Sequence, residues 1–321
     1  MGQPETSERQ RRARILFMGT PTFAARIVNA LLEYGFNLVG VITQPDKPKG
    51  RGRLLVSSPV KKVAELKALP VYQPERLKDP GVIDTIRGLL PDVVLVAAYG
   101  KILPQEILRL PSLGCFNVHA SILPAYRGAA PIPWAIINGE TVTGITIFKM
   151  DSGMDTGDVL VVRSLEIQPH ETAGELTERL AECAVPVVIK ALEKIVLGNA
   201  ALVPQDSSRA TYAPLLKKAD GRVDWTLHTE EIRNRIRGLD PWPGAYTFWQ
   251  GRLLKLFKGH TESLDPALPP GRVVEASRRG LLIRTGSGVL RVDELQLQGS
   301  RRMNAPDFLR GHPLKEGEQL G

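Results

Sequence analysis

Apolar residues in the first half of the chain form short continuous runs that alternate with a stretch of helical spacing. Residues 14–19 (RILFMG), 37–44 (NLVGVITQ), 92–100 (DVVLVAAYG) and 114–119 (GCFNVH) have the composition of buried strands. Residues 22–35 place apolar side chains at helical intervals and end at a glycine. Because strands that alternate with helices form parallel βαβ units, we expect an α/β domain with a doubly wound, mostly parallel, Rossmann-like sheet.

The next part of the chain combines strands with one long helix. Two β-rich runs flank a turn cluster, MDSGMDTGD, at residues 150–158, which holds three aspartates and two glycines. An apolar stripe at helical spacing then predicts a helix over about residues 171–197, with a kink at Pro186.

Short β-type runs separated by glycine and proline dominate the chain from Tyr212 onward, and one helical piece at residues 229–239 interrupts them. This pattern predicts a small OB-like β-barrel. We place the domain boundary near Gln205. The predicted parts are a flexible tail (1–13), an α/β domain (14–204) and a barrel (205–321) of a kind that often binds nucleic acid. Three tryptophans are expected in the barrel core: Trp225, Trp242 and Trp249.

Length and composition are those of a globular protein. The 321 residues are 43% hydrophobic, and the longest apolar run, near residues 93–98, is far too short to span a membrane. Cys115 and Cys183 are far apart, and the five histidines have no metal-site spacing, so no metal is expected. A disulfide is possible but not needed, which favours the reducing cytoplasm.

Basic charge is concentrated in two places. The net charge is 42 − 34 = +8, and residues 43–62 carry six Lys and Arg against one acid, Asp46. Residues 205–321 add 19 Lys and Arg against 14 Asp and Glu. This distribution suits a polyanionic partner, although a chain kept soluble by its charge would look similar.

The candidate chemistry lies at the end of the run GCFNVH. Asn117 and His119 are two residues apart on a strand and therefore share a face. An amide N–H can stabilise the oxyanion of acyl or formyl transfer, and an imidazole can manage the amine's proton. A carboxylate from the turn cluster would fix the histidine tautomer and favour its charged form; spacing alone does not choose among Asp151, Asp155 and Asp158. A structural role for the histidine is the alternative.

These residues resemble those of the folate-dependent formyltransferases. The segment NVHASILPAYRGAAP followed by Asp155 has that family's Asn-x-His…Asp pattern. FMGTPTFA, TQPDKPKGRG, AYGKILP and DPWPGA extend the resemblance to the branch that acts on methionyl-tRNA, over nearly the whole chain. The first of these lacks a full G-x-G-x-x-G, which argues against a nicotinamide enzyme. The resemblance implies Asn117, His119 and Asp155 as catalytic residues, 10-formyltetrahydrofolate as formyl donor, and initiator Met-tRNA as acceptor.

The resemblance also implies two binding regions. Folate would contact the SILP turn and the apolar pair of GKILP, which are Ser121, Ile122, Leu123, Pro124, Ile102 and Leu103. The long basic loop, expected to be mobile until it meets RNA, would bind tRNA through Lys47, Lys49, Arg51 and Arg53. We expect a monomer. Two rival functions stay open: formylation of a small amine, such as glycinamide ribonucleotide or an amino sugar, and non-catalytic RNA binding.

Overall fold

The computed structural model describes residue 8 and residues 12–49, 54–264 and 266–321. Most of the predicted tail, together with Arg51 and Arg53, lies outside these residues. The chain divides into two compact units. The first contains residues 1–129, 143–165 and 177–213, and the second contains residues 130–142, 166–176 and 214–321.

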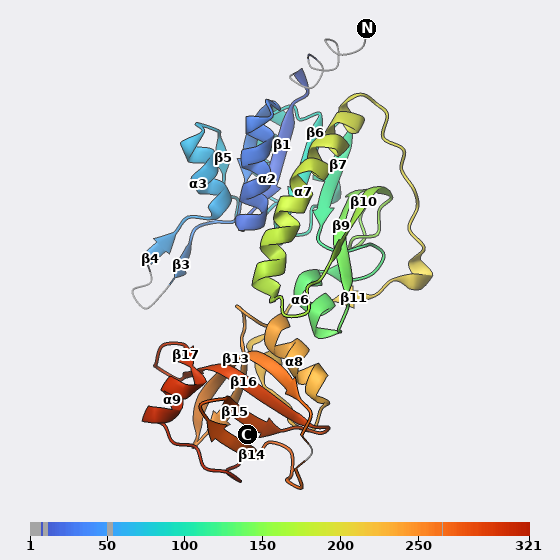
Figure 1. Ribbon diagram of the computed structural model, residues 1–321. Coiled ribbons are helices and arrows are strands. Elements are labelled where there is room, and N and C mark those ends of the chain that lie inside the picture. Colours follow the sequence, from blue (N-terminus) through green and yellow to red (C-terminus); the bar gives the residue numbers. More distant parts are fainter. Residues whose placement is uncertain (1–7, 9–11, 50–53, 265) are drawn as a thin grey trace. The chain divides into compact units, whose positions relative to one another are not determined.

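The first unit is built on a seven-stranded sheet of order β10-β9-β7-β6-β1-β2-β5. Strands β7, β6, β1, β2 and β5 pair in parallel, whereas β9 runs antiparallel to β7, so the predicted doubly wound, mostly parallel sheet is confirmed (Figure 1). Its strands are β1 (Ile15–Gly19), β2 (Leu38–Ile42), β5 (Val71–Tyr72), β6 (Val93–Ala97), β7 (Gly114–His119), β9 (Val142–Lys149) and β10 (Val159–Glu166). The helices of this part of the chain are α2 (Thr22–Glu33), α3 (Pro59–Leu66), α4 (Pro80–Gly88), α5 (Gln105–Leu108) and α7 (Ala173–Val196).

Continuous apolar strands form this sheet because both of its faces are covered. On one face, Leu16 and Met18 of β1 join a core cluster with side chains from α4 and α5. Helices α2 and α7 lie side by side in Figure 1, and Arg26 of α2 forms an ion pair with Glu182 of α7 at 3.0 Å. Helix α7 continues through Pro186, within two residues of its predicted ends.

Close backbone packing fixes the turn between β9 and β10. A Cβ atom added at Gly157 would lie 1.7 Å from the carbonyl oxygen of Lys149. We therefore expect Gly157→Ala to lower the free energy of unfolding by at least about 2 kcal/mol, because the backbone oxygen cannot move aside without distorting the turn. Urea denaturation checks this against Gly81→Ala, where an added Cβ meets nothing within 4 Å. Equal stability of the two variants would contradict the packing.

The second unit is an antiparallel sheet of order β12-β13-β16-β15-β14, with β17 paired to β16. Its C-terminal residues bridge the two end strands, because Gly321 N–H donates to Phe248 of β12 at 3.0 Å and Val273 N–H of β14 donates to Glu318 at 2.9 Å. The expected β-barrel domain is therefore present as an antiparallel sheet closed by the chain's last residues. Its elements are β12 (Ala245–Trp249), β13 (Arg252–Glu262), β14 (Val273–Ser277), β15 (Gly280–Arg284), β16 (Val289–Leu297), β17 (Met303–Asn304), α6 (Pro131–Ile137), α8 (Thr229–Gly238) and α9 (Ala305–Gly311).

A single boundary at Gln205 does not describe the two units. Residues 205–213 belong to the first unit, where β11 (Tyr212–Ala213) pairs in parallel with β8 (Arg127–Gly128). Two earlier segments join the second unit, and Ile137 of α6 packs in its core. The prediction followed the change in composition along the chain, which does not detect segments that leave one unit to pack in the other.

The three tryptophans expected in the barrel core differ in environment. Trp225 and Trp249 are each 6% exposed and belong to the core of the second unit. Trp242 is 51% exposed, so that prediction is wrong for this residue.

Both cysteines are free, and burial raises the pKa of the Cys115 thiol to about 12. None of the helices in the described part of the chain combines the length and apolar character needed to cross a membrane.

Candidate active site

The predicted Asn-x-His pair lies at the carboxyl end of β7, beside the point where the strand order of the parallel sheet reverses. From β1 the sheet continues to β2 and β5 on one side, and from β6 it continues to β7 and β9 on the other. The order therefore reverses between β1 and β6, and β7 lies next to β6. Ligands of doubly wound sheets bind at such ends. Asn117 and His119 share one face of β7. Among the described residues the half-buried Asn117 side chain has no hydrogen-bond partner, so its amide N–H groups are available.

His119 is held between a backbone carbonyl and a carboxylate. Its Nε2 lies 2.9 Å from the carbonyl oxygen of Tyr126, and its Nδ1 lies 3.7 Å from Oδ2 of Asp155. A carbonyl oxygen only accepts, so Nε2 carries a proton and donates it to Tyr126. The Tyr126 carbonyl therefore fixes the tautomer. This corrects the expectation that a carboxylate fixes it. The Nδ1 position faces Asp155.

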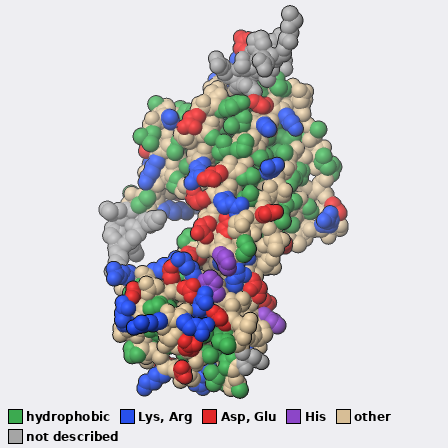
Figure 2. Space-filling view, in the orientation of Figure 1, with side chains coloured by type: hydrophobic (Ala, Val, Ile, Leu, Met, Phe, Trp, Pro, Cys, Tyr) green, Lys and Arg blue, Asp and Glu red, His purple; other side chains and the backbone are tan. Residues whose placement is uncertain are grey.

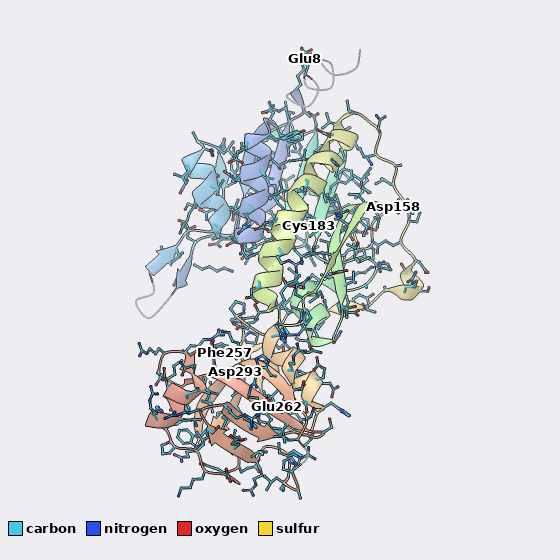
Figure 3. All side chains as sticks on the ribbon, viewed as in Figure 1. Glu8, Asp158, Cys183, Phe257, Glu262 and Asp293 are labelled. Atoms are coloured by element: carbon cyan, nitrogen blue, oxygen red, sulfur yellow. The ribbon has the colours of Figure 1, made fainter. Side chains whose placement is uncertain are left out.

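Of the three aspartates in the turn cluster, the structure brings Asp155 to His119. Its side chain is 15% exposed and that of His119 is 6% exposed. Asp151 is exposed and accepts hydrogen bonds within its own turn, from Gly153 N–H at 2.9 Å and the Thr156 hydroxyl at 2.6 Å. Asp158, labelled in Figure 3, is also exposed. The structure therefore distinguishes candidates that spacing alone could not.

Asp155 is fixed by its backbone as well as its side chain. Its φ of +55° is unusual for a residue other than glycine, and such conformations persist only where the surroundings enforce them. Oδ2 accepts a hydrogen bond from Gly128 N–H at 2.8 Å. The Gln205 amide donates to the carbonyl oxygens of Asp155 and Gly157 at 2.9 and 2.7 Å. Arg127 in turn donates to Gln205 Oε1 at 2.8 Å.

Gln205 is thus a positioning residue that the sequence did not single out, since it lies 50 residues beyond Asp155. For the formyl transfer that the resemblance implies, we expect Gln205→Ala to lower kcat about 10-fold, because the turn that presents Asp155 loses two of its hydrogen bonds. The KM for the tRNA should stay within about 2-fold. Steady-state kinetics tests this, and Gln205→Glu, which retains one acceptor oxygen for Arg127 but no N–H donors, should be equally slow. Unchanged kcat in both variants would remove Gln205 from the site.

The predicted folate-contacting turn, residues 121–124, is bound to β9. The buried Ser121 hydroxyl donates to Ala125 at 2.6 Å. Thr146 of β9 donates to the Ser121 carbonyl at 2.7 Å and accepts from Leu123 N–H at 3.1 Å. Leu123 is buried, whereas Ile122 and Pro124 are half-buried. These hydrogen bonds hold the turn against β9.

The two apolar residues of GKILP lie in different environments. Leu103 is 4% exposed and packs in the core cluster with Tyr99, whereas Ile102 is 89% exposed. Ile102 alone of the pair offers free apolar surface. The buried Tyr99 hydroxyl has no partner among the described residues, and burial raises its pKa to about 12. Tyr99 is therefore neutral near pH 7 and does not act as a base.

The basic segment expected to be a mobile loop contains a short hairpin, which corrects that expectation for its described part. Strand β3 (Lys47–Lys49) pairs antiparallel with β4 (Leu54–Val56). Lys47 is exposed and donates to Gln44 Oε1 at 2.7 Å, and the side-chain amide of Gln44 donates to the Tyr99 carbonyl at 2.8 Å. The base of the hairpin is thereby tied to the end of β6.

Asp46 anchors the base of this hairpin. Its carboxylate accepts hydrogen bonds from Lys61 of α3 and from Gln73, both at 2.7 Å. The bond from Lys61, followed by that from Gln73, lowers the pKa of Asp46, and the same pairing raises the pKa of Lys61. The only acid of the basic segment therefore orients the hairpin.

If the hairpin binds tRNA, as the resemblance implies, we expect Asp46→Ala to raise the KM for Met-tRNA several-fold while kcat at saturating tRNA changes by less than about 2-fold, because the hairpin keeps its charges but loses its orientation. Steady-state kinetics with varied tRNA measures both constants. Asp84→Ala, at an exposed carboxylate that pairs only within α4 with Arg87, is the matched control. An equal effect of the two changes would mean that only net charge matters.

Comparisons with known proteins identify the family of the chain. The formyl transferase family profile matches residues 12–192, and the profile of the formyl transferase C-terminal domain matches residues 215–313. The methionyl-tRNA formyltransferase of Geobacter metallireducens is 47% identical over 96% of this chain and 98% of its own length.

Solved structures share the fold. The methionyl-tRNA formyltransferase from Clostridium thermocellum has a TM-score of 0.57 at 18% identity, over 89% of this chain and 98% of its own. HypX from Aquifex aeolicus in complex with tetrahydrofolic acid has a TM-score of 0.64 at 20% identity. That match covers 96% of this chain and 50% of HypX, so the chain spans about half the length of HypX. The family profiles and the sequence relatives show that the chain belongs to the formyl transferase family, in its methionyl-tRNA formyltransferase branch.

Proposed function

We propose that this protein transfers the formyl group of 10-formyltetrahydrofolate to the amino group of methionine on initiator tRNA, with Asn117, His119 and Asp155 as its catalytic residues. The observation that carries the proposal is the placement of His119 between Tyr126 and Asp155 at the carboxyl end of β7. Family membership supplies the reaction, and this arrangement supports the choice of residues.

The three side chains suit the steps of the reaction. The amine attacks the formyl carbon, and the carbonyl oxygen becomes an oxyanion that the Asn117 amide can stabilise. His119 presents its Nδ1 to Asp155 and can exchange a proton with it. The attacking amine must lose a proton and the departing N10 of the folate must gain one. Asp155 Oδ1, which has no partner among the described residues, is suited to accept the first of these protons, directly or through a water.

Two binding regions complete the proposal. The folate lies against residues 121–124 and the exposed Ile102, and the tRNA is held by Lys47, Lys49, Arg51 and Arg53. Lysine and arginine contribute salt-dependent affinity for RNA phosphates by releasing counterions. The enzyme works as a monomer in the cytoplasm. Among the described residues, no group of His, Cys, Asp and Glu side chains is arranged to hold a metal ion.

One assay separates this function from its rivals. The protein is incubated with 10-formyltetrahydrofolate and methionine-charged initiator tRNA, and formylmethionine is quantified after hydrolysis of the ester. Parallel reactions offer a nucleotide-linked amino sugar and glycinamide ribonucleotide. We expect turnover with the charged tRNA at least about 100-fold above that with either small amine. A preference for a small amine, or tight tRNA binding without turnover, would overturn the proposal.

A further inference from the structure

The outer surface of β12 and the turn before it carry one largely exposed and two partly exposed aromatic rings, beside two cations that form no ion pair within the described part of the chain. We define the β12 aromatic face as Trp242, Tyr246 and Phe248 with the neighbouring Arg222 and Lys255. We propose that this face binds unpaired nucleotides of the tRNA by stacking their bases on its rings. The inference rests on the proposed function, since it assigns a further binding site to the same RNA.

Alternation along β12 divides its residues between two environments. Ala245, Thr247 and Trp249 are buried, whereas Tyr246 and Phe248 are partly exposed on the opposite face. The two exposed rings are neighbours, with centroids 5.8 Å apart and planes at 87°. A barrel strand with two adjacent aromatic rings on its outer face has the arrangement that single-strand-binding proteins use for stacking.

Trp242 lies three residues before β12, in a turn that is tied to Lys255, the residue opposite Tyr246. It is 51% exposed, the only tryptophan of the second unit's barrel segment with a largely free ring. Gly244 N–H donates to the Leu239 carbonyl at 2.9 Å and closes the turn. Arg302 forms an ion pair with Asp240 at 3.1 Å. Lys255 donates to the Pro243 carbonyl at 3.0 Å. A large apolar side chain exposed on a fixed turn is preorganised for binding, because little conformational entropy is lost when a ligand covers it.

The two cations of this face have no ion-pair partner among the described residues, whereas several others of the unit, such as Lys258, are paired. Arg222 is exposed, with its guanidinium 5.8 Å from the centre of the Phe248 ring, and Lys255 lies opposite Tyr246 on β13. Neither has a carboxylate within ion-pairing distance among the described residues. By contrast, Lys and Arg lie among Asp and Glu on the face of this unit shown in Figure 2. Arg291, for example, pairs with both Glu262 and Asp293, and Figure 3 labels these two acids.

Unpaired positive charge beside exposed rings favours an anionic, aromatic ligand over an apolar protein surface. Single-stranded RNA presents both features, because its bases have free π-faces and its phosphates are negative. Paired stems hide their bases from such rings. The site therefore fits an unpaired segment of the tRNA and adds to the phosphate contacts of the hairpin.

The test uses the full chain and an eight-nucleotide single-stranded RNA with a fluorescent 5′ label. Binding is followed by anisotropy, with the same sequence annealed to its complement for comparison. We expect the single strand to bind more tightly than the duplex, and Trp242→Ala to weaken it about 10-fold. Arg222→Gln should reduce the slope of log affinity against log salt by about 0.7. Tyr34→Ala, at an exposed ring of the first unit, should leave affinity unchanged.

Kinetics with charged tRNA separates this inference from the proposed function. Trp242→Ala should raise the KM for Met-tRNA with kcat unchanged, and thermal unfolding should match the wild type because the ring is exposed. Suppose the protein formylates no tRNA but binds the oligonucleotide, and Trp242→Ala removes that binding. This result would overturn the proposed activity but not the RNA site. Equal RNA affinity of the wild type and Trp242→Ala would overturn the site. So would a preference for the duplex, or capture of a protein partner through Trp242 in place of RNA.

Discussion

Replacing His119 with alanine should reduce kcat for formyl transfer about 10³- to 10⁴-fold while changing the affinity for Met-tRNA less than about 2-fold. The imidazole is buried at the carboxyl end of β7 and donates from Nε2 to Tyr126. Its loss removes the group that faces Asp155. The tRNA-binding residues proposed on the hairpin are unaffected, so binding and chemistry should separate.

Rapid-quench single-turnover assays measure the chemical step, and filter binding measures the affinity for tRNA. His312→Ala provides a control, because this histidine stacks on Phe308 in the second unit and has no role in the proposed chemistry. Thermal unfolding shows whether either variant is misfolded. A folded His119→Ala enzyme with more than about a tenth of wild-type turnover would contradict the catalytic assignment.

Neutralising the hairpin should have the second-largest effect. The variant with alanine at Lys47, Lys49, Arg51 and Arg53 should raise the KM for Met-tRNA roughly 100-fold near 0.1 M salt. Each phosphate contact contributes about 0.7 to 0.9 to the slope of log affinity against log salt, so loss of four contacts should lower that slope by about 3. The kcat at saturating tRNA should change little, because the hairpin carries none of the proposed catalytic residues.

The matched control removes the same charge from exposed lysines of the first unit: Lys67, Lys78, Lys190 and Lys194. A salt titration of tRNA binding compares the two variants. If both lower the slope equally, the positive charge acts at long range and the hairpin is not a defined binding element.

The parallel sheet was predictable because its strands are buried on both faces and therefore appear as continuous apolar runs. The Asn-x-His pair was found for a related reason. Polar side chains at the end of a buried strand are unexpected unless they have a function, and β7 ends at His119. The hairpin was missed because β3 and β4 have three residues each, too few to show alternation above the many lysines, arginines and prolines of the segment.

Other features depend on contacts between distant residues, which no local pattern records. The tautomer of His119 is set by the Tyr126 carbonyl, and every residue has such a carbonyl. Gln205 supports Asp155 from beyond the long helix, at the position where the composition suggested a domain boundary. Trp242 was placed in the core because tryptophan is usually well buried, but its turn holds the ring in solvent.

The central claim is that His119 and Asp155 act together on one formyl group, and a double-mutant cycle tests it most directly. The single-turnover rate constant is measured for the wild type, His119→Ala, Asp155→Asn and the double variant at saturating folate and Met-tRNA. If the pair acts as a unit, the double variant is about as slow as the slower single variant, because removal of one member already eliminates the contribution of the other. Rate losses that multiply would show that the two side chains act independently, and would contradict this account of the site.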